Sequence, residues 1–347
     1  MAGWAWDVCR IEGRGCAIYW LVRLGVSMAF RMEKLKQLWR LVRESHAEPL
    51  KGEPRKPAVL GVEEQAATFI GHSSFLVQMK VLGVLIDPVF ATRLILLRRQ
   101  RRPGVRVKDL PVIDAVLLTH AHMDHLNRPS LRAVVQEMRR RGRVAPVAIV
   151  PNGVEDLVTD LGFSKVVELK WWESAEVLGL KVTATPARHW GARMFKDTHR
   201  GFGGYVLEAE GAETVYHSGD TAYFGGFAEI GKRLAPKIAL LPIGAYFPDS
   251  YRSVHTSPEE ALQGFLDLGA ETMVPMHYNT FRLGREPMDE PLARLLTAAE
   301  RAGVLERVRV LGEGERLLVG GEVRTAVASK GKALRPKLSG PEVYSVG

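Results

Sequence analysis

Short apolar runs separated by turn-forming residues recur along most of the chain and predict a layered domain of strands and helices. From about residue 66, the stretches ATFIG, SFLVQMK and VLGVLIDPVF have the length and apolar content of buried strands. Further strands are predicted at residues 113–118, 147–151, 182–187, 204–209, 213–219, 238–243 and 272–277, with a closing hairpin at 307–320. Helices are predicted at residues 130–141, 153–161, 225–233, 258–268 and 289–302. This order favours an α/β or α+β domain with helices outside stacked sheets.

The N-terminal segment has a different pattern. Residues 16–30 are apolar, but the run is short and Arg23 interrupts it, so it predicts neither a membrane-spanning helix nor a signal peptide. Residues 18–42 place apolar positions three and four apart among Lys and Arg, which predicts a basic helix. Such a helix can lie on an acidic membrane or pack on its own domain, and the sequence leaves both interpretations open.

Polar, proline-rich residues at 45–58 indicate a linker, and the basic last residues indicate a flexible tail. We therefore expect a basic helix and linker at residues 1–57, one main domain at 58–328 and a tail at 329–347. Met28 and Met32 are also suitable start residues, so the sequence leaves open whether residues 1–31 belong to the native protein.

The net charge of +9 and the isoelectric point near 9.6 favour anionic partners. Residues 93–108 (RLILLRRQRRPGVRVK) hold seven basic groups and no acid, which fits either a solvated loop or a contact with an anionic surface. The two cysteines, Cys9 and Cys16, exclude a disulfide framework or a cysteine zinc site in the main domain. Any metal must be held by histidine and carboxylate, and the composition fits a cytoplasmic protein.

Residues 117–129, LLTHAHMDHLNRP, concentrate three of the chain's ten histidines beside an aspartate. In a loop that follows a strand, alternate side chains converge, so His120 and His122 suit one cation. Asp124 and His125, further along the loop, suit a second. Neutral imidazole together with carboxylate is a ligand set for zinc, and also for iron or manganese.

Three further candidates each follow a different predicted strand. His189 lies in TPARHWGAR, Asp220 in HSGDTAY and His277 in VPMHYNT. Loops at strand ends on a rigid scaffold are a common place for binding and catalytic residues. Together with the histidine cluster, these residues predict a site for two divalent cations, with Zn²⁺ preferred and Mn²⁺ or Fe²⁺ as alternatives.

This set resembles the ligand pattern of the metallo-β-lactamase superfamily. The resemblance implies an α+β fold, a four-layered αββα sandwich with a two-metal site. It also implies that His120, His122 and His189 hold one metal, that Asp124, His125 and His277 hold the other, and that Asp220 bridges them.

A longer series of motifs narrows the resemblance. GHSSFLVQM, LIDPVF, THAHMDHLNRPSL, PARHWGARMF, SGDTAY, LLPIGAYFP, HTSPEEAL and MHYNTFRL occur in this order between residues 66 and 300. They resemble the family of N-acyl-phosphatidylethanolamine phospholipase D and its bacterial relatives. One departure is Tyr278–Asn279, where the family pattern has Trp-Gly; this pair follows His277, so the exact substrate stays open.

The resemblance implies hydrolysis of N-acyl-phosphatidylethanolamine-like lipids to phosphatidic acid and an N-acylethanolamine. In the expected mechanism, a hydroxide that bridges two zinc ions attacks phosphorus, and Asp124 binds a metal and orients that nucleophile. His255 is expected by resemblance to protonate the leaving oxygen. The expected partners are a phospholipid substrate and an acidic membrane surface, with peripheral association; nucleic acid is not expected, and the oligomeric state, including a dimer, stays open.

Four other residues are candidates for roles near the site. Arg193 could bind a phosphate oxygen or form a surface salt bridge, and Tyr246 could line the pocket or belong to the core. Tyr278 is a candidate substrate contact beside His277. His72 in GHSS is expected to hydrogen-bond to a ligand rather than bind metal itself.

Three other classes of function remain as alternatives. A sugar-lactone hydrolase of the same fold would need no membrane surface, and activity on lactones would distinguish it. A metal-dependent ribonuclease would bind RNA with a steep salt dependence. A metal-stabilised binding protein would contain metal without hydrolysing generic phosphodiesters.

Overall fold

The computed structural model describes residues 32, 36–37, 39–57, 60–61, 64–193 and 197–319. The predicted tail and most of the predicted basic helix lie outside these residues. Residues 39–47 are helical, so the helix reaches into the segment predicted as a linker. None of the helices in the described ranges has the length and apolar character that crossing a membrane requires.

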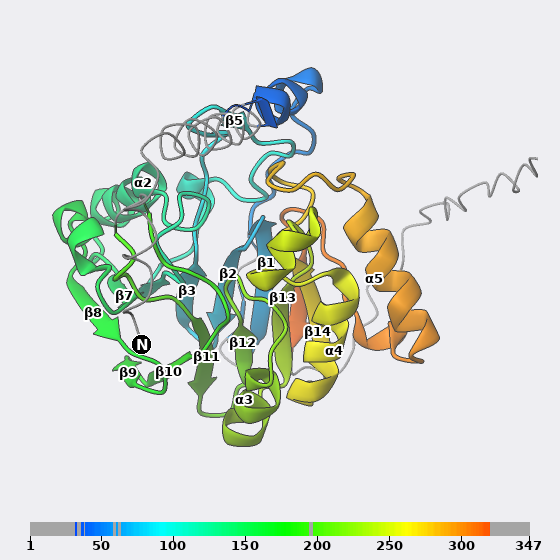
Figure 1. Cartoon of the computed structure of the whole chain (residues 1–347). Coiled ribbons are helices and arrows are strands. Elements are labelled where there is room, and N and C mark those ends of the chain that lie inside the picture. The colour runs from blue at the N-terminus through cyan, green and yellow to red at the C-terminus, as the bar shows by residue number, and fades with distance from the viewer. Residues whose placement is uncertain are drawn as a thin grey trace, which may run out of the picture.

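Two sheets form the centre of the molecule (Figure 1). The first has the order β15-β1-β2-β3-β6-β7-β8 and the second β14-β13-β12-β11-β10-β9. The strands of the first sheet are β1 (Gln65–Gly71), β2 (Ser74–Met79), β3 (Leu82–Ile86), β6 (Ala115–Leu117), β7 (Val147–Pro151), β8 (Lys165–Leu169) and β15 (Arg316–Val319). Those of the second are β9 (Ser174–Val177), β10 (Leu180–Thr185), β11 (Gly204–Ala209), β12 (Val215–His217), β13 (Ile238–Pro242) and β14 (Thr272–Met276). A small separate hairpin joins β4 (Arg93–Leu94) to β5 (Leu97–Arg98).

Helices cover the outer faces of both sheets. The α-helices are α2 (Arg128–Arg140), α3 (Gly226–Leu234), α4 (Pro258–Leu268) and α5 (Glu290–Arg301). The 3₁₀ turns are η1 (Val107–Asp109), η2 (Glu155–Leu157), η3 (Thr159–Leu161), η4 (Asp249–Ser253) and η5 (Leu305–Arg307). Apolar side chains of α2 pack with the first sheet, and those of α3, α4 and α5 pack with the second. The arrangement is the four-layered αββα sandwich, so the expected fold is confirmed.

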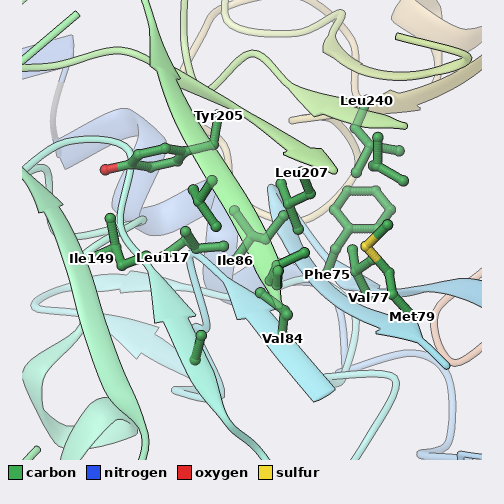
Figure 2. Close-up of a cluster of buried hydrophobic side chains, with 14 of the residues drawn as sticks. Phe75, Val77, Met79, Val84, Ile86, Leu117, Ile149, Tyr205, Leu207 and Leu240 are labelled. Carbon is green, nitrogen blue, oxygen red and sulfur yellow. The ribbon is translucent and has the colours of Figure 1, made fainter. Parts of the chain in front are cut away.

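The core between the sheets is made by strand residues of both. Phe75 of β2, Ile86 of β3 and Leu117 of β6 meet Leu207 of β11 and Leu240 of β13 in one buried cluster (Figure 2). Both faces of β2 are buried, which explains why SFLVQM reads as a continuous apolar run and not as an alternating one. This rigid double sheet fixes the positions of the loops at the strand ends.

The predicted helix at 153–161 is wrong. The segment forms the two short 3₁₀ turns η2 and η3, separated at Val158, whose φ is −132°. The Glu168 carboxylate accepts hydrogen bonds from the backbone nitrogens of Val154 and Glu155, both at 2.9 Å. This long-range contact, together with the helix-disfavouring Val and Thr residues, accounts for the difference.

The predicted hairpin at 307–320 is also wrong. Arg309 N donates to Met273 O at 2.8 Å, and Val308 forms a bridge with Met273 beside the second sheet. The following strand β15 instead pairs antiparallel with β1 in the first sheet. The segment thus crosses from one sheet to the other, because each part finds an unpaired strand edge.

Candidate metal centre

The predicted ligands meet at one end of the two sheets. His120, His122, Asp124 and His125 follow β6, His189 follows β10, Asp220 follows β12 and His277 follows β14. The carboxyl ends of β3 and β6 share one edge because the strands are parallel, and the same holds for β12, β13 and β14. The fold therefore brings residues more than 150 positions apart into one cluster.

The cluster has two groups. His120, His122 and His189 form the first, with His120 Nε2 2.8 Å and His189 Nε2 3.3 Å from His122 Nδ1. Each of these short nitrogen–nitrogen contacts requires a shared proton or a shared cation.

Asp124, His125 and His277 form the second group, together with His72. Asp124 Oδ2 lies 3.6 Å from His125 Nε2 and 3.7 Å from His277 Nε2. Asp220 Oδ2 joins the groups: it is 3.0 Å from His277 Nε2 and 3.3 Å from His125 Nε2. It also lies 4.0 Å from His120 Nε2 and 4.0 Å from His189 Nε2.

Several buried atoms of the cluster lack hydrogen-bond partners within the described part of the chain. Those that face the other ligands are His125 Nε2, His277 Nε2 and Asp220 Oδ1. A buried polar atom without a partner is costly, and native structures rarely keep three of them together. Imidazole nitrogens and a carboxylate oxygen that converge in this way fit divalent cations such as zinc.

Burial and neighbouring charges shift the pKa values of these histidine and aspartate side chains in ways that set their protonation states. Burial lowers the pKa of His120 and of His189 well below the usual value, so both stay neutral. Burial alone would raise the pKa of Asp124 and of Asp220, but nearby imidazoles hold both carboxyls well below their usual range. The first group thus offers neutral imidazoles, and the second offers carboxylates.

The second group is expected to lose its cation first as the pH falls. Although burial opposes it, Asp220 and Asp124 raise the pKa of His277 to about 9 and raise that of His125 as well. Below its pKa a histidine holds a proton that a cation must displace, so the affinity of this group rises with pH up to about 9. The first group has lowered histidine pKa values and competes with protons only at lower pH. Cation content per chain, measured after dialysis over a pH range, should fall in two steps; a single step would contradict the expectation.

Asp87, which the sequence interpretation gave no role, orients one of these ligands. This buried residue follows β3, and its Oδ2 accepts hydrogen bonds from His125 Nδ1 at 2.7 Å and from Thr119 Oγ1 at 2.6 Å. Its Oδ1 accepts from Thr119 N at 2.8 Å. These contacts fix the ring so that Nε2 faces the cluster, a common arrangement around metal ligands. The sequence did contain one indication of this role, because Asp87 comes directly after the buried run VLGVLI, as the candidate ligands come after theirs.

His72 lies where the sequence predicted. Its Nε2 donates to Asp124 Oδ2 at 2.9 Å, and its backbone oxygen accepts from His277 N at 2.9 Å. Burial lowers its pKa to about 3, so the ring is neutral. His72 therefore connects Asp124 and His277, although its position within the second group also allows direct ligation.

His255 also belongs to the cluster. It lies between η4 and α4, and its Nδ1 is 3.8 Å from Asp220 Oδ2. Ser257, two residues later, caps α4, which fixes this part of the chain. Trp190 is half exposed, and its ring centre lies 4.4 Å from that of His122.

The two candidate tyrosines lie deeper. Tyr246 is buried, its hydroxyl donates to Glu290 at 2.7 Å, and its ring lies against the Arg294 guanidinium. Tyr278 is buried in the cluster between the second sheet and its helices. Both positions fit core residues, and Tyr278 lies beside His277 in the same pocket lining.

Arg193 clamps the ligand loop. Its Nη1 donates to Ala121 O and to Leu126 O, both at 2.9 Å, so one side chain spans the segment that carries His122, Asp124 and His125. This role differs from both interpretations of the sequence.

Arg193→Lys is expected to lower kcat by about tenfold, because hydrogen bonds from a charged donor contribute about 1.5–3 kcal/mol and Lys cannot reproduce the planar geometry. The kinetics should be followed with the cation content and the thermal midpoint. Arg188→Lys, five residues away on the same loop, serves as the control. Unchanged kinetics in Arg193→Lys would show that the clamp does not position the loop.

The fold and this donor set define a class, that of metal-dependent hydrolases with the metallo-β-lactamase fold. The family model described as "Beta-lactamase superfamily domain" matches residues 83–278, more than half of the chain. The chain belongs to this superfamily.

Relatives with different names are similar to this chain. The N-acyl-phosphatidylethanolamine-hydrolyzing phospholipase D of Saccharomyces cerevisiae mitochondria is 32% identical over 69% of this chain and 53% of the yeast protein. A UPF0173 metal-dependent hydrolase of Rubrobacter xylanophilus is 33% identical over 62% of this chain and 81% of its own. Among solved structures, Igni18, described as a novel metallo hydrolase from Ignicoccus hospitalis, aligns with a TM-score of 0.57 and 29% identity over 75% of this chain and 100% of that chain.

Proposed function

We propose that the chain is a phosphodiesterase of the phospholipase D type that hydrolyses N-acyl-phosphatidylethanolamine-like lipids. The products would be phosphatidic acid and an N-acylethanolamine. The observation that carries the proposal is the pair of ligand groups joined at Asp220, with Asp124 and His255 beside them. The activity named for the yeast relative supports the substrate class.

In the proposed centre, His120, His122 and His189 would hold one divalent cation and Asp124, His125 and His277 the other, and Asp220 would serve both groups. Zinc fits this set, and manganese or iron are alternatives. When bound, such a pair supplies an activated water near neutral pH and charge for the phosphoryl oxygens.

The chain's own groups then have distinct tasks. The Asp124 carboxylate, fixed by the hydrogen bond from His72, accepts a proton from the attacking water and orients it. His255 lies on the Asp220 side of the cluster, where it would protonate the leaving alkoxide. Burial lowers the pKa of His255 to about 4 in the free protein; a bound phosphodiester anion would raise it.

His255→Gln is expected to affect substrates according to their leaving groups. An alkoxide needs a proton, so lipid hydrolysis should fall by about 10²–10⁴-fold, the usual contribution of a general acid. p-Nitrophenolate leaves without one, so hydrolysis of bis(p-nitrophenyl) phosphate should fall much less. Equal losses on both substrates would assign His255 to binding and not to proton transfer.

The substrate is tested directly with purified full-length chain loaded with zinc or manganese. N-acyl-phosphatidylethanolamine vesicles should yield phosphatidic acid and N-acylethanolamine, identified by mass spectrometry, and Asp220→Asn should abolish both. Absence of these products at full cation occupancy would refute the proposal.

A second candidate is a hydrolase of lactones or other esters on the same centre. It is favoured by the similarity to a relative named only as a metal-dependent hydrolase, and by Tyr278–Asn279 where the phospholipase family has Trp-Gly. The same activated water can attack a carbonyl carbon. A higher kcat/KM on lactones than on any phosphodiester would select this alternative; a ribonuclease remains the least supported.

A further inference from the structure

A helix and a hairpin lie side by side in the structure. Arg98 N, at the end of β5, donates to Ser45 Oγ at 3.0 Å, and Gln100 Nε2 donates to Ser45 O at 2.8 Å. Figure 1 shows the blue helix and β5 together at the top of the view. These contacts join helical residues 39–47 to the β4–β5 hairpin.

The inner side of the hairpin faces the site. Leu94 and Leu97 pack in one apolar cluster with Val89 and Phe281. The ring centre of Phe281 lies 5.2 Å from that of His72, which itself binds Asp124. The hairpin is therefore separated from the metal centre by a single layer of side chains.

The outer side of the hairpin is apolar and basic. Ile95 and Leu96 form its two-residue turn and are 73% and 48% exposed, and Arg93 beside them is exposed. Two-residue hairpin turns favour Asn, Asp and Gly because they need a positive φ. Ile95 has a φ of 53°, a conformation that β-branched residues strongly disfavour. An exposed, strained Ile–Leu turn indicates that the apolar tip makes a contact.

The helix adds a matching stripe. Among the described residues, Met32, Lys36, Trp39 and Arg43 are each helical and stand three or four positions apart, the spacing of side chains on one helix face. All four are exposed, whereas Leu41 and Ser45 on the opposite face are buried. Apolar and cationic groups thus alternate along the outward side.

We propose that this docking surface binds an anionic lipid bilayer. We define it as the exposed residues Met32, Lys36, Trp39, Arg43, Arg93, Ile95 and Leu96. Isolated apolar side chains interleaved with Lys and Arg suit the boundary between head groups and acyl chains. The charge is complementary because Glu44, the one acid among the described residues of this helix, is bound by Arg40 at 2.8 Å and lies 3.7 Å from Arg282.

The inference rests on the proposed function in one respect: a lipid substrate would enter the centre from the bilayer on which this surface lies. Docking itself needs no hydrolysis. The two can therefore fail separately.

Co-sedimentation of the cation-loaded full chain with vesicles tests the surface. Binding should be strong to phosphatidylcholine vesicles that contain phosphatidylglycerol and weaker to phosphatidylcholine alone. Ile95→Ser with Leu96→Ser should weaken binding to both vesicle types by at least about tenfold, through lost apolar burial. Arg43→Gln with Arg93→Gln should weaken binding to the anionic vesicles alone, by about fivefold for each residue.

Matched controls exclude general effects. Val81 is as exposed as Ile95, at 73%, but lies in the β2–β3 turn, at the end of these strands away from His72. Val81→Ser, and Lys232→Gln with Arg301→Gln on the outer helices, should bind as the parent does. All variants should hydrolyse bis(p-nitrophenyl) phosphate at the parent rate.

Three outcomes would overturn the proposal. One is absence of binding to anionic vesicles, and another is equal binding by the parent and the docking-surface variants. The third is self-association in light scattering that Ile95→Ser with Leu96→Ser removes, which would assign the surface to a contact between copies. A chain that docks but releases no phosphatidic acid would uphold docking and refute the proposed function.

Discussion

Asp124→Asn is expected to reduce phosphodiester hydrolysis by about 10²–10⁴-fold, the range for loss of a positioned base. Asn has the same shape but lacks the negative charge that the second ligand group and the attacking water require. In the structure, Asp124 Oδ2 accepts from His72 Nε2 at 2.9 Å and faces His125 and His277. The measurement is kcat on bis(p-nitrophenyl) phosphate, together with cations bound per chain.

Cation content separates the two tasks of Asp124. A variant that binds one cation fewer shows the ligand role, and one that keeps both but loses kcat shows the role in proton transfer. Asp114→Asn is the control, because Asp114 accepts a hydrogen bond from Gly83 N at 2.9 Å at the opposite end of β6. Full activity and full cation content in Asp124→Asn would remove Asp124 from the mechanism.

Asp87→Ala is expected to weaken cation binding by about 10–100-fold, as loss of a carboxylate behind a ligating histidine does. The change removes the acceptor for three buried donors: His125 Nδ1, Thr119 Oγ1 and Thr119 N. Each buried donor left without a partner costs about 1–3 kcal/mol, so the free energy of unfolding should fall as well. Affinity is measured by competition with a chelator, and stability by urea unfolding of the cation-free chain.

Thr119 provides a graded comparison. Thr119→Val removes the hydroxyl that donates to Asp87 and also contacts His120 Nδ1 at 2.9 Å, but it leaves His125 bound to Asp87. The cation affinity of the second ligand group should therefore change less than in Asp87→Ala. An equal loss at that group would show that Asp87 acts by holding the loop after β6 and not by orienting the imidazole of His125.

The sequence predicted the layered fold and the residues that now form the cluster. Both have local signals: buried strands read as apolar runs, and four candidate ligands stand within six positions of one loop. His189, Asp220 and His277 were found because each directly follows such a run. The structure brings these seven residues together, and their role as ligands is a proposal that cation analysis will test.

Contacts between distant residues could not be predicted in the same way. Arg193 donates hydrogen bonds to Ala121 O and Leu126 O, about 70 positions away in the sequence. No local sequence pattern predicts a contact between residues so far apart. Asp87 has no other candidate ligand near it in the sequence. The three groups that donate hydrogen bonds to its carboxylate come from Thr119 and His125, so only the folded structure reveals them. The apolar residues at 153–161 have the spacing of a helix. The first backbone nitrogens of the segment, however, donate hydrogen bonds to the Glu168 carboxylate.

The pairing of β15 with β1 has a consequence for synthesis on the ribosome. Ala66 and Ala67 of β1 pair with Leu318 and Leu317 of β15, so the first of the described strands to be synthesised stays unpaired on this side until the last of them is complete. Until then, one side of β1 presents unpaired amide and carbonyl groups that can template aggregation. A nascent chain stalled before residue 316 should therefore depend on chaperones, whereas release of the complete strand should end that dependence.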